Sequence, residues 1–167
     1  MADTRKTFGQ IYDRYIEKIY RFIFFKVNSQ EIAEDLASET FLKTWKVFKD
    51  EEKSIENMQA FLYKTARNLV IDYYRKNGKV QIVSVDNPSI TDPSQNLEEK
   101  EMLRSDVNMV KAALTNLKDD YQNVIIWHYL DDLPIEEISY ILGRTEDATR
   151  VLLHRALKSL KKEIKEA

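Results

Sequence analysis

The most constraining feature of this chain is a short apolar stretch, a glycine and a basic stretch that follow one another over about residues 134–162. The apolar stretch is expected to be a helix over about 134–142, because large side chains recur at the three-and-four spacing that buries one helix face: Ile135, Ile138, Ile141 and Leu142. Gly143 can adopt the left-handed backbone that ends a helix, and Thr145 is a candidate N-cap for the next one. The pattern predicts a helix-turn-helix.

The second helix of this pair is expected to have one packed side and one largely basic side. Its packed side can be supplied by Val151, Leu152, Ala156 and Leu160. The remainder carries Arg150, His154, Arg155, Lys158, Lys161 and Lys162. Such a helix suits the major groove of DNA. Two ordinary bundle helices with solvated lysines are the alternative.

Composition excludes several other classes of protein. A chain of 167 residues with 43% hydrophobic content can form one ordinary domain or two small ones. The absence of cysteine excludes disulfides, thiolate zinc sites and cysteine nucleophiles. No apolar run approaches the roughly 18 residues of a membrane helix, and the first residues lack the apolar core of a signal peptide. We therefore expect a cytoplasmic protein.

No enzyme site is visible in the sequence. The two histidines, His128 and His154, have no metal-ligand spacing, so packing or phosphate contact explains them better than zinc does. Glu136 and Glu137 are adjacent, so on a helix they point in different directions and make an unconvincing catalytic pair. We expect no catalysis, no cofactor, no metal and no small-molecule substrate.

Charge is segregated along the chain, although the net charge is only −2. Residues 60–80 hold five basic residues and one acidic residue, a local charge of +4. Residues 144–162 hold six basic residues and two acidic ones, again +4, whereas residues 86–106 hold two basic and six acidic residues, a charge of −4. The pattern predicts two basic surfaces on either side of an acidic segment.

Helix breakers divide the chain into two parts. Gly78 ends a long periodic segment, and Pro88 and Pro93 lie in a polar stretch. The sequence predicts an all-α fold with two small helical domains over 1–78 and 107–167, the second a helix-turn-helix, joined by a flexible acidic linker over 79–106. In this linker, apolar and polar residues alternate in VQIVSV well enough to allow a short extended segment. Fourteen of the eighteen aromatic residues precede Gly78, so the first domain is expected to have its own aromatic core.

The first domain is expected to contain three helices. The first repeats apolar residues from Phe8 to Ile23. The second spans about 30–48 with Ser29 as a candidate cap, and is expected to bury Ile32, Leu36, Phe41, Trp45 and Phe48. Its early turns are acidic, with Glu31, Glu34, Asp35 and Glu39, which a preference for the helix dipole partly explains.

A third helix starts near Met58 and carries two different faces. One face is core, with Met58, Phe61, Leu62, Thr65, Ala66, Leu69, Val70 and Tyr73. The opposite face has Lys64, Arg67, Asn68, Ile71, Asp72 and Arg75, which combine positive charge with side chains able to hydrogen-bond phosphate or base edges. An ordinary solvated face is the alternative.

These motifs together resemble the bacterial sigma factors of the sigma-70 family, in its extracytoplasmic-function group, over about residues 8–164. EIAEDLASETFLKTW, residues 31–45, resembles the family's segment that docks on the clamp helices of the large polymerase subunit. FLYKTARNLVIDYYRK, residues 61–76, resembles its helix for the minus-ten promoter element. LPIEEISYILGRTEDATRVLLHRALKSL, residues 133–160, resembles its minus-35 reader.

The resemblance implies a protein that binds core RNA polymerase, directs it to specific promoters and assists DNA opening. It implies polymerase contacts by Glu31, Asp35, Glu39, Thr40 and Lys43. Minus-ten contacts would come from the loop Ser54 to Asn57, which receives a flipped base, and from Lys64, Arg67, Asn68, Arg75 and Lys76. Minus-35 contacts would come from Arg144, Thr145, Glu146, Asp147, Thr149, Arg150, His154, Arg155 and Lys158. An anti-sigma factor is a further expected partner, and the acidic linker would thread the polymerase's RNA path.

One departure from the family pattern concerns the second helix of the helix-turn-helix. The family usually has a polar or basic run there, whereas this chain has Val151 and Leu152. We expect both side chains to join the core, with contact to thymine methyl groups as the alternative. Two other functions stay open, a stand-alone helix-turn-helix regulator that binds duplex DNA, and a sigma mimic that acts as a protein-interaction module.

Overall fold

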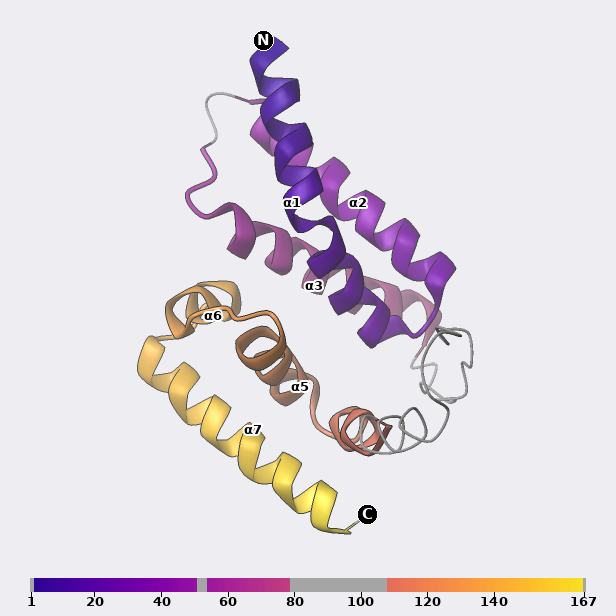
Figure 1. The fold of residues 1–167 in the computed structure, drawn as a ribbon, viewed down its shortest axis with the longest axis vertical. Helices are drawn as coiled ribbons and strands as arrows, with labels where there is room; N and C mark the ends of the chain where they lie inside the picture. The colour runs from indigo at the N-terminus through magenta and orange to yellow at the C-terminus, as the bar shows by residue number, and fades with distance from the viewer. Residues whose placement is uncertain (1, 51–53, 79–107, 167) are drawn as a thin grey trace, which may run out of the picture. The chain divides into compact units, whose positions relative to one another are not determined.

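The computed structural model describes residues 2–50, 54–78 and 108–166 of the chain, and these residues form helices and short connections without a strand (Figure 1). The helices are α1 (Ala2–Val27), α2 (Gln30–Phe48), α3 (Met58–Asn77), α5 (Asp119–Ile125), η1 (Ile126–Leu130), α6 (Ile135–Leu142) and α7 (Glu146–Glu166), and residues 108–115 are also helical. The all-α fold class is confirmed. The flexible linker, the extended piece in VQIVSV and the role of the acidic linker residues fall outside the described residues.

Two compact units divide the described helices. The first unit holds α1, α2, α3 and residues 136–145, and the second holds α5, η1 and α7. The domain boundaries expected from the sequence stay a prediction, because most of the expected linker lies outside the described residues. None of the described helices is long and apolar enough to span a membrane.

The first unit is built on three helices that pack against one another in pairs. Figure 1 shows α1 and α2 side by side, with α3 crossing them. The turn between α1 and α2 is tight, and Asn28 takes a left-handed φ of 52° there, which asparagine tolerates better than most residues. Phe22 and Tyr63 are buried in an edge-to-face contact with ring centroids 5.8 Å apart. The aromatic core expected for this part of the chain is therefore present.

A row of small residues lies along the buried side of α2. Ala33, Ala37, Thr40 and Thr44 recur every three or four residues and are at most 2% exposed. The two threonine hydroxyls donate to carbonyl oxygens one turn earlier, from Thr40 to Leu36 at 2.7 Å and from Thr44 to Thr40 at 2.8 Å. Because their hydroxyls are satisfied within α2, the threonines pack as small side chains. We call these four residues the small-residue row.

Side-chain caps set the starts of α2 and α3. The Ser29 Oγ accepts a hydrogen bond from the Ile32 N–H at 3.3 Å, and the Asn57 Oδ1 accepts one from the Ala60 N–H at 3.0 Å. The expected range of the second helix and its Ser29 cap are confirmed. Its expected core was partly wrong: Leu36 and Phe41 are buried, whereas Ile32, Trp45 and Phe48 are partly exposed.

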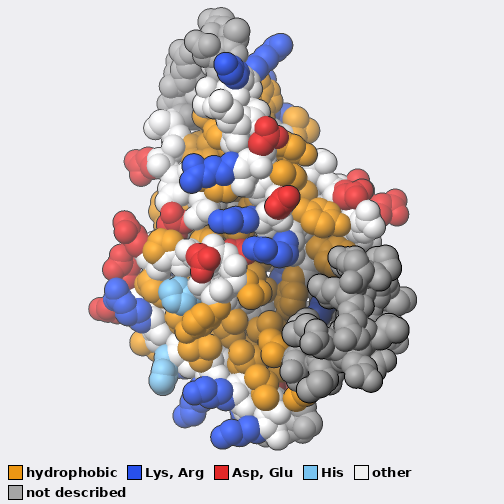
Figure 2. Space-filling view, viewed as in Figure 1, with side chains coloured by type: hydrophobic (Ala, Val, Ile, Leu, Met, Phe, Trp, Pro, Cys, Tyr) orange, Lys and Arg blue, Asp and Glu red, His pale blue; other side chains and the backbone are white. Residues whose placement is uncertain are grey.

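The second unit packs α5 against α7 and buries Trp127, Val124, Leu133 and Ala156 almost completely. A π-helical turn, η1, follows α5, and the Asp131 N–H donates to the Ile126 carbonyl oxygen at 3.0 Å. The His128 Nδ1 lies 3.0 Å from the carbonyl oxygen of Leu133, which favours packing over phosphate contact, the two explanations considered for this histidine. Figure 2 shows hydrophobic side chains gathered over α5 and α7, and Met109, Val110, Tyr129 and Leu130 are exposed in this unit.

The short helix α6 ends in the motif that the sequence predicts. Gly143 has a φ of 66°. Its N–H donates to the Tyr140 carbonyl oxygen at 3.3 Å, and the Arg144 N–H donates to the Ser139 carbonyl oxygen at 3.0 Å. This pair of bonds is a Schellman motif, which glycine favours because it lacks a Cβ. α7 begins at Glu146, directly after Thr145, so the expected helix, turn and helix are confirmed along the chain.

Candidate nucleic-acid and protein interfaces

An exposed charged stripe runs along α2. Glu31, Asp35, Glu39 and Lys43 follow one another at intervals of four residues, and all four are exposed. Four-residue spacing keeps them on one side of the helix over about 18 Å. The Lys43 Nζ lies 3.9 Å from the Glu39 Oε1, with both side chains about half exposed. Such an exposed pair is weak in water. With three carboxylates and one ammonium group, the stripe is acidic overall.

Thr40 does not share this stripe with the other expected polymerase contacts. Its side chain is 0% exposed, and its hydroxyl is bound to the Leu36 carbonyl oxygen. A residue five positions after Asp35 points to a different side of a helix that turns every 3.6 residues. Thr40 therefore contributes to the packing beneath the stripe, and its side chain has no surface to offer a partner.

The outer face of α3 carries exposed polar and basic side chains. Lys64, Asn68 and Arg75 lie on one side of the helix and are exposed, and Lys76 is exposed beside them. Arg67 is only partly exposed. This face combines cations suited to phosphates with an amide that can bond a base edge.

The loop before α3 brings Ser54 and Asn57 to the start of this helix. Ser54 is exposed, whereas Asn57 is partly buried and caps the helix through its side-chain oxygen. The cap occupies the Asn57 Oδ1 and leaves the side-chain amide as the group that suits a base or a phosphate. Asn57 therefore has a structural role that does not use its side-chain N–H groups.

At the start of α7, two acidic residues hold the first basic residue. The Arg150 Nη1 donates to the Asp147 Oδ1 at 3.0 Å, and its Nη2 lies 3.5 Å from the Glu146 Oε2. All three side chains are exposed. These contacts were not predicted from the sequence, although side chains three and four residues apart on a helix are neighbours. Acidic residues also suit a helix N-terminus, where the backbone N–H groups carry partial positive charge.

The remaining expected contacts of this region fall into an exposed and a buried set. Arg144, Thr145, His154, Arg155 and Lys158 are exposed. Thr149 is 0% exposed, so its side chain belongs to the packing of α7. Leu152 is 8% exposed and joins the core as expected. The same expectation was wrong for Val151, which is 49% exposed, because consecutive helix residues point about 100° apart.

Among the described residues, no group of three or more His, Cys, Asp or Glu side chains is arranged to hold a metal ion. The described surfaces consist of helices whose exposed sides carry charge and hydrogen-bonding groups. Such surfaces bind by electrostatic and hydrogen-bonding complementarity.

Comparison with protein families gives two matches in order along the chain. Residues 11–80 match the Sigma-70 region 2 family, and residues 108–160 match the Sigma-70, region 4 family. The first match includes α2 and α3, and the second includes α5, α6 and most of α7. Both matches are to regions of one family of proteins.

Similar proteins span most of this chain. It is 29% identical to the ECF RNA polymerase sigma factor SigM of Bacillus subtilis, covering 93% of each chain. It is 27% identical to the ECF RNA polymerase sigma factor BldN of Streptomyces coelicolor, covering 95% of this chain but only 61% of that one. The sigma factor RpoE from Bartonella quintana, crystallised with the anti-sigma factor NepR, has a similar fold, with a TM-score of 0.71, 23% identity, and coverage of 96% of this chain and 98% of that one.

Proposed function

The chain belongs to the sigma-70 family, in its extracytoplasmic-function group, and we propose that α2 binds core RNA polymerase while α3 and α7 bind promoter DNA. A sigma factor binds core polymerase, directs it to promoters and assists DNA opening. The observation that carries the assignment is the order of the two matched regions, residues 11–80 and 108–160, along one chain. The alternatives, a stand-alone regulator and a sigma mimic, are not favoured by that order.

The proposed polymerase contact is the exposed stripe on α2. Glu31, Asp35 and Glu39 place carboxylates along one side of this helix, and Lys43 ends the row. A basic partner surface, as the clamp helices of the large subunit would provide, complements this charge. Thr40 supports the stripe from below through its bond to Leu36.

The proposed minus-ten surface combines the loop before α3 with the outer face of that helix. The exposed Lys64, Arg75 and Lys76 suit phosphates, which adds affinity and salt dependence without sequence information. The exposed Asn68 suits a base edge, and the loop from Ser54 to Asn57 suits a base taken out of the stack.

The proposed minus-35 surface is the exposed side of α7 and the turn before it. Arg144, Arg155 and Lys158 suit phosphates, and Glu146 and Asp147 can accept hydrogen bonds from cytosine amino groups. Arg150 would exchange its carboxylate partners for DNA on binding. The exposed Val151 can touch a thymine methyl group.

Two further points complete the proposal. RNA synthesis belongs to the polymerase, so this chain supplies promoter choice and performs no chemistry of its own, and it works in the cytoplasm where the polymerase is. The similar Bartonella quintana protein was crystallised with an anti-sigma factor. We infer that a protein of this kind also restrains the present chain.

Transcription with purified core polymerase on fragmented genomic DNA tests the function. We expect discrete new start sites when the full chain is added and none with core polymerase alone. Tight core binding without new start sites would favour a mimic. Duplex binding by the free chain, without core binding, would favour a stand-alone regulator.

Charge reversal tests the surfaces separately. Arg75→Glu and Arg150→Glu change exposed residues of α3 and α7, and both should lower promoter-specific transcription by at least tenfold while core binding is retained. Arg14→Glu makes the same change of charge at an exposed position on α1 and should leave transcription within twofold of the unmodified chain. Equal activity of all three variants would contradict the proposed DNA surfaces.

A further inference from the structure

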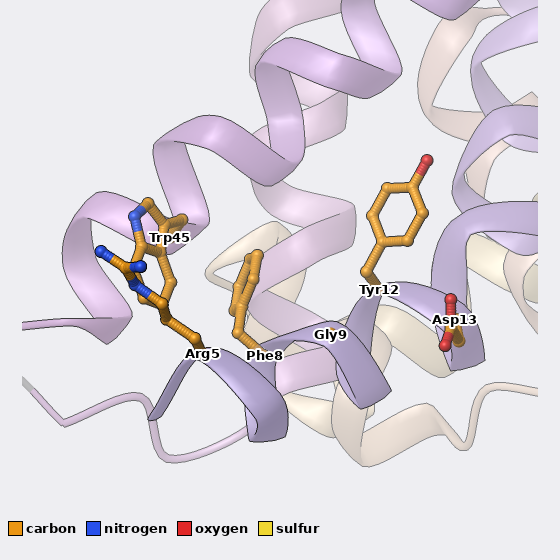
Figure 3. A pocket seen from close by; sticks show the side chains of 6 residues that line it. All are labelled: Arg5, Phe8, Gly9, Tyr12, Asp13 and Trp45. Atoms are coloured by element: carbon orange, nitrogen blue, oxygen red, sulfur yellow. The ribbon is translucent and has the colours of Figure 1, made fainter. Parts of the chain in front are cut away.

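An open groove of about 540 Å³ lies between the first turns of α1 and the last turns of α2. It is lined by Arg5, Phe8, Gly9, Tyr12, Asp13 and Trp45 (Figure 3). Figure 3 shows Arg5, Phe8 and Trp45 close together on one side of Gly9, and Tyr12 and Asp13 on the other. The volume suits one large apolar side chain with part of its backbone.

Aromatic rings form the walls of this groove. The Phe8 ring lies 5.2 Å from the Trp45 ring, and the Tyr12 ring lies 4.9 Å from the Phe41 ring beneath it, centroid to centroid. Phe8 and Trp45 are partly exposed, and Tyr12 is 43% exposed. Rings held in place by neighbouring rings offer a partner apolar area without losing side-chain freedom on binding.

Gly9 adds no side chain to the groove. It lies inside α1, where glycine is the least favourable residue apart from proline. Its φ is not left-handed, and a Cβ added to it would meet no heavy atom within 4 Å. Neither the backbone nor the packing of the described residues therefore requires glycine at this position. The consequence of having glycine here is free space above the helix between Phe8 and Tyr12.

Opposite charges mark the two ends of the groove. Arg5 and Asp13 are both exposed and lie eight residues apart, about 12 Å along α1. A nucleic-acid strand carries phosphates along its whole length and would meet the carboxylate of Asp13 at one end. A polypeptide can instead carry an acidic residue at one end and a basic residue at the other. The charges therefore favour a polypeptide occupant.

We propose that this groove docks a segment of a protein partner that places one aromatic or leucine side chain over Gly9, an acidic residue at Arg5 and a basic residue at Asp13. The site is separate from the stripe on α2, and its existence does not depend on the proposed polymerase and promoter contacts. The partner would bind the first unit where α1 begins and α2 ends.

Nuclear magnetic resonance of the full chain with synthetic peptides tests this site. The chain has two tryptophans, Trp45 in the groove and Trp127 at 0% exposure in the second unit, so their indole N–H signals provide a reporter and an internal control. The probe is a capped peptide with a central leucine, a glutamate on one side and a lysine on the other. Matched peptides carry two glutamates, two lysines, or alanine in place of leucine.

We expect a saturable shift of the Trp45 signal with the bipolar peptide and no shift of the Trp127 signal. The matched peptides should bind roughly threefold or more weakly, because each exposed charge contact contributes little. Gly9→Ala leaves most of the space open and should retain binding, whereas Gly9→Phe fills the groove and should weaken it at least tenfold. Arg5→Glu should shift the preference to the peptide with two lysines.

Several results would overturn the proposal. They are the absence of a saturable Trp45 shift, equal binding by Gly9→Phe, a common shift of both tryptophans, or equal binding of all peptides. Tighter binding of a twelve-residue oligothymidine would assign the groove to nucleic acid instead. A Trp45 shift that follows the concentration of the chain without peptide would make a second copy the occupant.

Discussion

The Arg150 guanidinium donates a hydrogen bond to the Asp147 carboxylate at 3.0 Å, one turn earlier on α7. Glu146, the residue before Asp147, also lies close, with its Oε2 3.5 Å from the Arg150 Nη2. A phosphate that approaches Arg150 must therefore compete with two carboxylates. Exposed pairs of this kind contribute at most about 1 kcal/mol, so DNA can replace them. In the proposed complex with DNA, these pairs would therefore lower the affinity gained from a contact between Arg150 and a phosphate.

Asp147→Asn should strengthen binding of the polymerase complex to promoter fragments. The change removes one negative charge and releases Arg150 toward a phosphate, so a plot of log affinity against log salt should become steeper by about 0.9. Titration at several salt concentrations measures this slope. Glu163→Gln, further along α7, is the matched control and should keep it. An unchanged slope in Asp147→Asn would show that Arg150 does not reach a phosphate.

Thr40→Val should separate packing from partner binding on α2. Valine keeps the shape of the buried side chain but loses the hydroxyl bond to Leu36, so the free energy of unfolding should fall by no more than about 1.5 kcal/mol. Affinity for core polymerase should stay within twofold, whereas Asp35→Lys should lower it by at least tenfold. A large loss of affinity with intact stability in Thr40→Val would mean that Thr40 contacts the partner after all.

Substitutions at Asn57 should separate helix capping from DNA contact. Asn57→Ala removes the acceptor of the Ala60 N–H and should cost about 1 kcal/mol of stability in urea unfolding. Asn57→Asp keeps a capping oxygen and should restore stability. If the side-chain amide contacts DNA, Asn57→Asp should still lose promoter opening. Full opening activity in this stable variant would exclude a role for the amide.

Leu152→Ala and Val151→Ala should differ sharply although the residues are adjacent. Leu152 is buried, so its truncation should cost about 2–5 kcal/mol. Val151 is half exposed, and alanine is the better helix former, so its substitution should change stability by no more than about 0.7 kcal/mol. Thermal unfolding measures both. If Val151 touches a thymine methyl group, Val151→Ala should also lose preference at one promoter position.

Alanine should have opposite effects at two glycines. Gly143 has a φ of 66°, so Gly143→Ala should cost about 1–2 kcal/mol through its backbone alone, since its Cβ would meet nothing within 4 Å. Gly9 lies in regular helix, so Gly9→Ala should stabilise α1 by about 0.5–1 kcal/mol. Urea unfolding followed by circular dichroism measures both. A loss of stability at Gly9 would mean that its glycine serves the fold.

Local sequence patterns were sufficient to predict the helices of the first unit and the helix-turn-helix. Ser29 lies at the start of α2 and Gly143 at the end of α6. Both helix ends are closed by hydrogen bonds between residues only a few positions apart, so the local sequence is enough to predict them. The π-helical turn at Ile126–Leu130 has no such local signal, because these residues include no glycine, proline or capping side chain. That turn was not predicted.

Exposure of individual side chains was harder to predict than the helices themselves. Thr40 and Thr149 are polar and were assigned to binding surfaces, yet both are completely buried. Val151 is apolar and was assigned to the core, yet it is exposed. Residue type does not decide these cases, because the angle of each residue around its helix, relative to neighbours distant in sequence, determines burial. The groove at Gly9 was missed for the same reason.

The small-residue row on α2 has a consequence for the exposed side of the same helix. Alanine and threonine along one side of the helix leave little room for longer side chains, since ridges of such residues allow close approach of neighbouring helices. The packing of this row therefore determines where α2 lies, and with it the positions of the exposed carboxylates on its opposite side. An added methylene in this row would shift α2 against its neighbours, and all the exposed carboxylates of the stripe would move with it.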